Sequence, residues 1–303
     1  MVGAGGAIIN YLFPGAREAP ESKGAENIVS MEDIRLEQGL HEECGVFGIY
    51  DPEGSCAQTT YYGLYALQHR GQEACGIAAI NDREQSFYKD VGLVSEVFDR
   101  ETLQRLNGTM AVGHVRYGTT GAANRGNCQP IEVNHVKGHM AIAHNGNLSN
   151  AAQLRGQLEL KGAIFHTTSD TEIIAYTITR KRLTCPSIEE ALSKAMDELE
   201  GAYSLVLMSP RKLICARDPY GFRPLCYGQL PGGGYVAASE SCALTAVGAR
   251  FVRDVEPGEI LVFSPEGMVA RREHCGKAAR RPCIFEMLIA TDYARKMALD
   301  MRM

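Results

Sequence analysis

Short apolar runs of strand length recur along the chain from residue 44 onward. Most are bounded by Gly, Pro, Asn or Asp, and runs of this kind between turn residues predict β-strands. Residues 216–221 and 230–235 contain the residue types of tight turns, which predicts hairpins at both places. The eight predicted strands cover residues 46–50, 76–80, 110–115, 139–144, 203–208, 212–216, 235–239 and 259–263.

Three helices are predicted in the middle of the chain, the first over residues 149–161. The other two begin after Ser169 and Ser187, where the spacing Ser-x-x-Glu is that of a capping box. In the third helix the apolar positions 188, 191, 192, 195, 196 and 199 fall on one face. Helices that cluster between two strand-rich regions favour an α+β fold, with antiparallel sheets and helices outside them.

Composition and charge narrow the class of protein. The 303 residues are 45% hydrophobic and 22% charged, which is typical of a globular protein. The net charge of −5 argues against nucleic acid as a partner. No run approaches the roughly 20 apolar residues that cross a bilayer, and no glycine-rich dinucleotide or phosphate loop is present. We expect a cytoplasmic protein with no membrane partner.

The ten cysteines include no C-x-x-C pair. In a long chain without a secretory signal, this spacing indicates reduced thiols rather than a disulfide framework or a local zinc site. Residues 1–30 have a Gly/Ala-rich start and a polar continuation, and we interpret them as disordered or mis-assigned, with Met31 as an alternative start. We expect residues 1–43 to form a leader ahead of Cys44.

Cys44 opens the first predicted strand and is a candidate nucleophile. A cysteine attacks an amide as the thiolate, and its ordinary pKa of about 8.5 requires a base. That base could be a histidine, for example His69, His114 or His144. Alternatively, cleavage before Cys44 would free an α-amine that accepts the thiol proton. Taken alone, Cys44 is more simply a small buried residue at the start of a strand.

Four further positions carry candidate chemistry, each beside a plainer structural interpretation. Asn145 and Gly146 fit an Asn-Gly turn, and could also donate to an oxyanion. Arg116 ends a strand, where it could form a structural ion pair or grip a carboxylate. Asp170 suits a helix N-terminus, and could also bind an ammonium group. Residues 68–72 are polar and predict a loop facing a pocket.

These motifs, in this order, resemble the glutaminase domain of the amidophosphoribosyltransferases, which are class II glutamine amidotransferases. The resemblance covers roughly residues 40–290, through ECGVFGIY, LQHRGQE, GHVRYGTTG, QP, AHNGNL, SDTE, GAYSLVLM, RDPYGFRPL, ASESCA and VEPGEI. It implies a four-layer αββα sandwich of the N-terminal-nucleophile hydrolase type. It also implies a glutaminase domain over residues 44–270, with residues 271–303 as a truncated remnant of linker and phosphoribosyltransferase domain.

The resemblance also implies roles for individual residues. Cys44 would be the nucleophile once residues 1–43 are removed, with Asn145 and Gly146 as the oxyanion hole. Arg116 would hold the glutamine α-carboxylate and Asp170 its α-amine. The pocket would also be lined by Arg70, Gly71 and Thr119.

The activity implied is the ammonia-supplying half of the first step of purine synthesis. In that step glutamine and phosphoribosyl pyrophosphate give 5-phosphoribosylamine, glutamate and pyrophosphate. Expected partners are glutamine and a phosphoribosyltransferase domain or subunit, and homo-oligomer formation stays open. Two alternatives also stay open: a catalytically silent fragment or regulatory subunit, and a glutaminase subunit that serves another acceptor.

The chain departs from the family pattern after the glutaminase motifs. The sequence has no phosphoribosyl pyrophosphate loop, and it stops soon after Cys283, which stands where some members place one iron–sulfur ligand. With the other ligands absent, we expect neither the iron–sulfur cluster nor the Mg²⁺ of the full-length family to be held by this chain. The glutaminase half should need no cofactor. The basic residues between 271 and 281 are expected to form a solvated linker.

Overall fold

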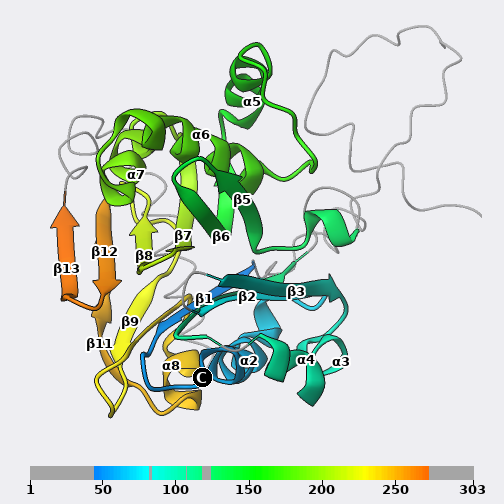
Figure 1. Cartoon of the computed structure of the whole chain (residues 1–303), viewed down its shortest axis with the longest axis vertical. Helices are drawn as coiled ribbons and strands as arrows, with labels where there is room; N and C mark the ends of the chain where they lie inside the picture. The colour runs from blue at the N-terminus through cyan, green and yellow to red at the C-terminus, as the bar shows by residue number, and fades with distance from the viewer. Residues whose placement is uncertain (1–43, 82–83, 107, 118–123, 273–303) are drawn as a thin grey trace, which may run out of the picture. The chain divides into compact units, whose positions relative to one another are not determined.

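The computed structural model describes residues 44–81, 84–106, 108–117 and 124–272 (Figure 1). The predicted leader, Thr119, Cys283 and all of the predicted remnant beyond Arg272 lie outside these residues. The last described strand ends at Arg272, so the first two arginines of the basic run belong to a strand. The described strands form two antiparallel sheets.

The first sheet has seven strands, and every neighbouring pair is antiparallel. In spatial order they are β11 (Arg250–Asp254), β9 (Cys226–Gln229), β10 (Tyr235–Ala238), β1 (Gly45–Tyr50), β4 (Met110–Arg116), β2 (Ala74–Asn81) and β3 (Glu84–Val91).

The second sheet has six strands with the same antiparallel pairing. In spatial order they are β13 (Gly267–Arg272), β12 (Glu259–Ser264), β8 (Lys212–Arg217), β7 (Gly201–Ser209), β6 (Gly138–Leu148) and β5 (Ile131–His135).

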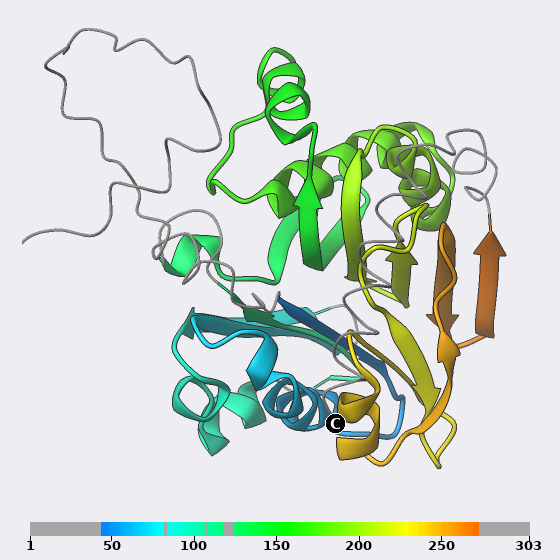
Figure 2. The same ribbon diagram turned by 180° about the vertical axis from the view of Figure 1, so that it is seen from behind.

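Helices cover the outer face of each sheet, as Figures 1 and 2 show. Those on the first sheet are α2 (Cys56–Ala66), α3 (Val94–Val97), α4 (Arg100–Arg105) and α8 (Ser241–Ala246). Those on the second are α6 (Asp170–Thr184) and α7 (Ile188–Met196), and α5 (Ala151–Glu159) packs against α6. Two short 3₁₀ helices, η2 (Gln68–Arg70) and η3 (Arg125–Asn127), lie in the connections.

Three apolar layers hold these elements together, and β1 shows how one strand serves two of them. Side chains alternate across a strand with a period of two, so Phe47 packs toward the helices while Val46 packs against the second sheet. The two sheets approach so closely that a Cβ on Gly48 would lie 2.5 Å from the Val206 side chain. The predicted four-layer αββα sandwich is therefore confirmed.

The eight predicted strands and the three mid-chain helices are all confirmed. The six apolar positions predicted for the third helix are all buried, although α7 ends at Met196 and Leu199 lies just beyond it. The clustering of helices in mid-chain is wrong, because α2 directly follows β1 and three more helices lie outside the middle. Five strands were also not predicted, namely β3, β5, β9, β11 and β13.

Two local predictions need correction. The turn after β8 does not close a hairpin, because β9 joins the other sheet; residues 230–235 do connect the antiparallel pair β9–β10. At α6, the Ser169 hydroxyl accepts from the Thr171 N–H at 3.2 Å, as an N-cap should. The buried Glu172 carboxylate instead accepts the N–H groups of His166 and Thr167, so no reciprocal capping box forms there.

All eight cysteines in the described part of the chain are free thiols, and Cys242 is the exposed one. No helix within the described ranges is both long enough and apolar enough to cross a membrane.

Candidate active site

Cys44 sits where β1 and β4 begin to pair. Gly45 is registered opposite Val115, which brings the Cys44 sulfur to the backbone of Tyr117 just beyond the end of β4. The Tyr117 N–H donates to Sγ at 3.4 Å, and the thiol lies 3.8 Å from the Tyr117 carbonyl. Among the described residues, no histidine forms a hydrogen bond with this sulfur.

Burial raises the pKa of the Cys44 thiol, against the opposing effect of the Tyr117 and Cys44 N–H groups and of Arg116 and Arg70. The group is therefore a thiol at neutral pH in the uncleaved chain, and needs a base to react.

The three histidines considered as partners are all engaged elsewhere. Burial lowers the pKa of His114 to about 3, so its ring is neutral, and its Nε2–H donates to the His144 carbonyl at 3.2 Å. His144 Nδ1 lies 3.4 Å from Asp170 Oδ1. His69 Nε2 lies 3.0 Å from Glu240 Oε2. None of these three histidines therefore pairs with the Cys44 thiol.

A cavity of about 270 Å³ opens beside the Cys44 thiol. It brings together four of the predicted site residues, Cys44, Arg116, Gly146 and Asp170, from segments far apart in the sequence. The remaining lining residues are Tyr117, Asn127, Gln129, His144, Asn147, Leu148, Ala151, Thr168 and Ser169.

Arg116 and Asp170 give the cavity one cation and one anion. Arg116 ends β4 as predicted, with its side chain 9% exposed and Nη1 3.2 Å from Glu73 Oε1. Asp170 opens α6, and its Oδ2 accepts the Leu148 N–H at 3.0 Å. Burial works to raise the Asp170 pKa, but His144 and the Leu148 and Thr171 N–H groups lower it overall. A fixed charge of each sign suits a zwitterionic ligand.

Asn145 and Gly146 lie within β6 and do not form the predicted Asn-Gly turn. They pair with Ser204 and Tyr203 of β7, and Gly146 has φ +143°. A Cβ at Gly146 would lie 2.0 Å from the Ala202 carbonyl oxygen, so the close approach of β7 requires glycine here. The Asn145 side chain is fully buried, and neither its nitrogen nor its oxygen has a partner within the described ranges.

Such an unpaired buried amide is costly unless a ligand completes it. Asn145 is next to Gly146, which lines the cavity. This position suits a side-chain amide that donates a hydrogen bond to a group formed only during a reaction.

Arg70 and Gly71 lie against the backbone of Cys44 and Arg116, respectively, and do not line the cavity. Arg70 Nε donates to the Cys44 carbonyl at 3.2 Å, and its Nη1 donates to Glu240 Oε1 at 2.6 Å. A Cβ on Gly71 would lie 2.6 Å from the backbone of Arg116. The segment predicted as a pocket-facing loop is partly the η2 turn, and it fixes the backbone on which the cavity residues stand.

The local sequence pattern did not predict several polar residues that line the cavity. Gln129 Oε1 accepts the His144 N–H at 2.7 Å. Asn127 and Thr168 exchange two hydrogen bonds, at 3.0 and 3.2 Å. These residues come from connections without periodicity. Of them, only Gln129 carried a signal, as part of the QP motif of the family resemblance.

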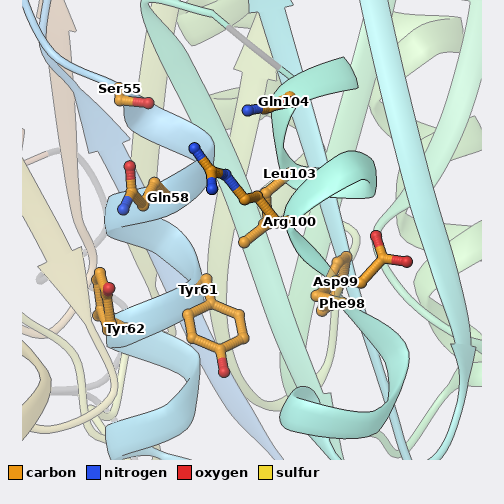
Figure 3. A pocket seen from close by; sticks show the side chains of 9 residues that line it. All are labelled: Ser55, Gln58, Tyr61, Tyr62, Phe98, Asp99, Arg100, Leu103 and Gln104. Atoms are coloured by element: carbon orange, nitrogen blue, oxygen red, sulfur yellow. The ribbon is translucent and has the colours of Figure 1, made fainter.

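A larger cavity, of about 600 Å³, lies between α2 and the α3–α4 region (Figure 3). Its lining contains no thiol and no cluster of converging buried polar groups. The residues are Ser55, Gln58, Tyr61, Tyr62, Phe98, Asp99, Arg100, Leu103 and Gln104. Size therefore does not mark the reactive site in this molecule.

The described residues do not fit an iron–sulfur cluster, which requires four thiolates. The group of metal-ligating side chains that they bring together is His69, Glu240 and Cys242, with one thiol.

Comparison with known proteins agrees with this geometry. Residues 114–246 match the model of the glutamine amidotransferase domain. The amidophosphoribosyltransferase of Methanocaldococcus jannaschii is 46% identical over 240 residues, which are 79% of this chain and 51% of the relative. The chain therefore carries a glutamine amidotransferase domain, and over most of its length it is similar to the amidophosphoribosyltransferases.

Two solved structures extend the similarity to the fold of this amidotransferase domain. One is described as the allosteric regulatory enzyme of purine biosynthesis, with a TM-score of 0.72 and 46% identity over 76% of this chain and 49% of that chain. The other is the glutamine phosphoribosylpyrophosphate amidotransferase of B. subtilis, with a TM-score of 0.70 and 45% identity over 76% of this chain and 49% of its own. The chain spans about half the length of the relatives it matches.

Proposed function

We propose that this domain hydrolyses the side-chain amide of glutamine to glutamate and ammonia, with Cys44 as nucleophile. The observation that carries the proposal is the single cavity lined by Cys44, Arg116, Gly146 and Asp170. In it, Arg116 would bind the α-carboxylate of glutamine and Asp170 its α-ammonium, which directs the side-chain amide toward the sulfur.

The base in this proposal is the α-amine of Cys44 itself, freed by cleavage of the Glu43–Cys44 bond. Two features support it. The thiol lacks a histidine partner among the described residues, and the Cys44 nitrogen already lies close enough to its own sulfur to lower the thiol pKa. An amide nitrogen cannot accept a proton at neutral pH, whereas an α-amine with a pKa of about 7.7–8.0 can.

The amine takes the thiol proton as the sulfur attacks the amide carbon of glutamine. The tetrahedral oxyanion is held by the Asn145 side-chain N–H and the Gly146 backbone N–H. When the C–N bond breaks, the proton passes from the amine to the departing nitrogen, and ammonia leaves a thioester. Water, activated by the same amine, then releases glutamate and restores the thiol.

Ammonia formed in this way would serve an acceptor domain or subunit that uses phosphoribosyl pyrophosphate, in the first step of purine synthesis. Support comes from the similar proteins, one of which is described as a glutamine phosphoribosylpyrophosphate amidotransferase and another as an enzyme of purine biosynthesis. Arg70 and Gly71 would act as positioning residues behind Cys44 and Arg116. We further place the protein in the cytoplasm, where thiols such as the eight described stay reduced.

The test combines processing with activity. Intact-mass measurement should show loss of residues 1–43, and the processed protein should release glutamate from glutamine. Cys44→Ala should abolish release, while Cys185→Ala, which removes a buried thiol at the end of α6, should leave it unchanged. Protein that begins at Cys44 and releases no glutamate would contradict the activity. Uncleaved protein with full activity would contradict the amine base.

A further inference from the structure

His69, Glu240 and Cys242 converge on one point behind the nucleophile. His69 comes from η2, Glu240 immediately precedes α8, and Cys242 is the second residue of that helix. His69 Nε2 lies 3.0 Å and Cys242 Sγ 3.5 Å from the same oxygen, Glu240 Oε2. The three ligand atoms all lie within 4.8 Å of one another.

The two separations from Glu240 Oε2 are close to those of ligands around a tetrahedral zinc ion. With bonds of about 2.3 Å to sulfur and about 2.1 Å to nitrogen and oxygen, neighbouring ligand atoms lie about 3.4–3.6 Å apart. The nitrogen–oxygen distance of 3.0 Å and the sulfur–oxygen distance of 3.5 Å need changes of only a few tenths of an ångström. His69 and Cys242 are exposed, so an ion can enter without opening the fold.

We propose that His69, Glu240 and Cys242 form a binding site for a divalent cation of the zinc class, with water in the fourth position. One imidazole, one carboxylate and one thiolate select zinc or cobalt over magnesium and calcium, which prefer oxygen ligands throughout. On binding, the Cys242 thiol loses its proton to solvent and the sulfur coordinates as the thiolate.

Arg70 holds the carboxylate of this site in place and connects it to the nucleophile. Its Nη1 donates to Glu240 Oε1 at 2.6 Å, which leaves Oε2 directed at His69 and Cys242. Outer contacts of this kind orient metal ligands. The same guanidinium donates through Nε to the Cys44 carbonyl. An ion bound here would therefore be connected to the Cys44 carbonyl through the side chains of Glu240 and Arg70.

Cobalt is the probe for the test, because thiolate coordination gives Co²⁺ a charge-transfer absorption that other exposed ligands do not. The full chain with Cys44→Ala is titrated with Co²⁺, so that the nucleophile cannot contribute a thiolate and glutamine hydrolysis plays no part. We expect one bound ion with a thiolate band, displaced by Zn²⁺. Cys242→Ser should remove the band, and His69→Gln should weaken binding about 100-fold.

Two matched variants separate this site from other ligands in the chain. His139→Gln changes another exposed histidine, and Cys283→Ser changes a cysteine outside the described residues. Both should bind Co²⁺ as the parent does. A parent protein that shows no thiolate band, or a band that survives Cys242→Ser, would overturn the proposal and leave His69–Glu240 as an ion pair alone. Either result is independent of whether the processed enzyme hydrolyses glutamine.

Discussion

The cavity beside Cys44 and the larger cavity between α2 and α4 differ in how firmly the protein holds their polar side chains. In the smaller one, the lining residues Arg116, Gln129 and His144 are each at most 7% exposed as whole residues. Asn145, next to the lining residue Gly146, is fully buried, and hydrogen bonds or packing hold each of these residues. In the larger one, polar residues such as Gln58, Arg100 and Gln104 are exposed to solvent.

The difference identifies which cavity can catalyse. Groups that are held before the substrate arrives need no reorganisation during the reaction, and in a water-poor site their charges act more strongly. Exposed groups on an outer helix can bind a ligand but provide no such fixed field. Equivalent substitutions in the two regions should therefore have unequal effects.

The largest difference is expected between two glycines, Gly146 near the nucleophile and Gly156 in the outer helix α5. Gly146→Ala places a methyl group 2.0 Å from a paired backbone carbonyl, at a φ of +143°. It should destabilise the fold by about 4 kcal/mol or more. At Gly156 no atom lies within 4 Å, and alanine should stabilise the helix by about 0.5–1 kcal/mol. Denaturant unfolding measures both, and equal midpoints would contradict the assignment of β6.

Asn145→Ala should lower kcat for glutamine hydrolysis about 10²–10³-fold, the usual effect of losing an oxyanion donor. KM should change little, because the donor acts in the transition state. Since the buried amide has no partner among the described residues, its removal should leave the free energy of unfolding unchanged or raised. Gln58→Ala in the larger cavity is the control and should leave kcat unchanged. A variant that loses stability and activity together would indicate a structural role for Asn145.

The sequence predicted the parts of this site better than their arrangement. Arg116, at the end of a strand, and Asp170, at the start of a helix, are marked by local patterns that the structure keeps. The Asn145–Gly146 pair was placed in a turn because that dipeptide favours one. The glycine is instead required by the Ala202 carbonyl of a strand more than fifty residues away. Local propensity cannot report such a contact.

The strands and helices that the sequence pattern did not predict were missed for the same reason. The edge strands β3 and β11 contain no fully buried residue, so they show no buried apolar run. Helix α2 packs glycine and threonine against the first sheet, where Gly63 lies against Phe47, and its apolar residues do not form one stripe. In each case a partner distant in sequence decides the structure, and the hydrophobic period alone is weak.

Arg116→Met should lower kcat/KM for glutamine about 10–100-fold, mostly through KM, because the lost contact is a charged hydrogen bond to the bound substrate. Arg100→Met makes the same change in the larger cavity and should have no effect on hydrolysis. Steady-state kinetics of the two processed variants provide the comparison. Equal losses would mean that net charge, rather than a fixed contact, sets the affinity for glutamine.

His114 offers the smallest and most specific test, because it is buried between the sheets beside the site while His139 is exposed. Burial lowers the His114 pKa from 6.5 to about 3. Between these values the unfolded chain binds a proton that the folded protein does not, so stability falls as the pH falls. From pH 6.5 to 5 the loss from this group should be about 1.6 kcal/mol.

His114→Asn keeps an N–H donor for the His144 carbonyl but removes the titrating group, so its unfolding free energy should fall less over that pH range than that of the parent. His139→Gln should follow the parent. Denaturant unfolding at about pH 6.5, 5.75 and 5 measures the difference. Parallel curves for the parent and His114→Asn would show that the His114 ring is solvated. The contact of His114 with β6 would then not be a rigid support for the smaller cavity, and the contrast between the two cavities would lose that basis.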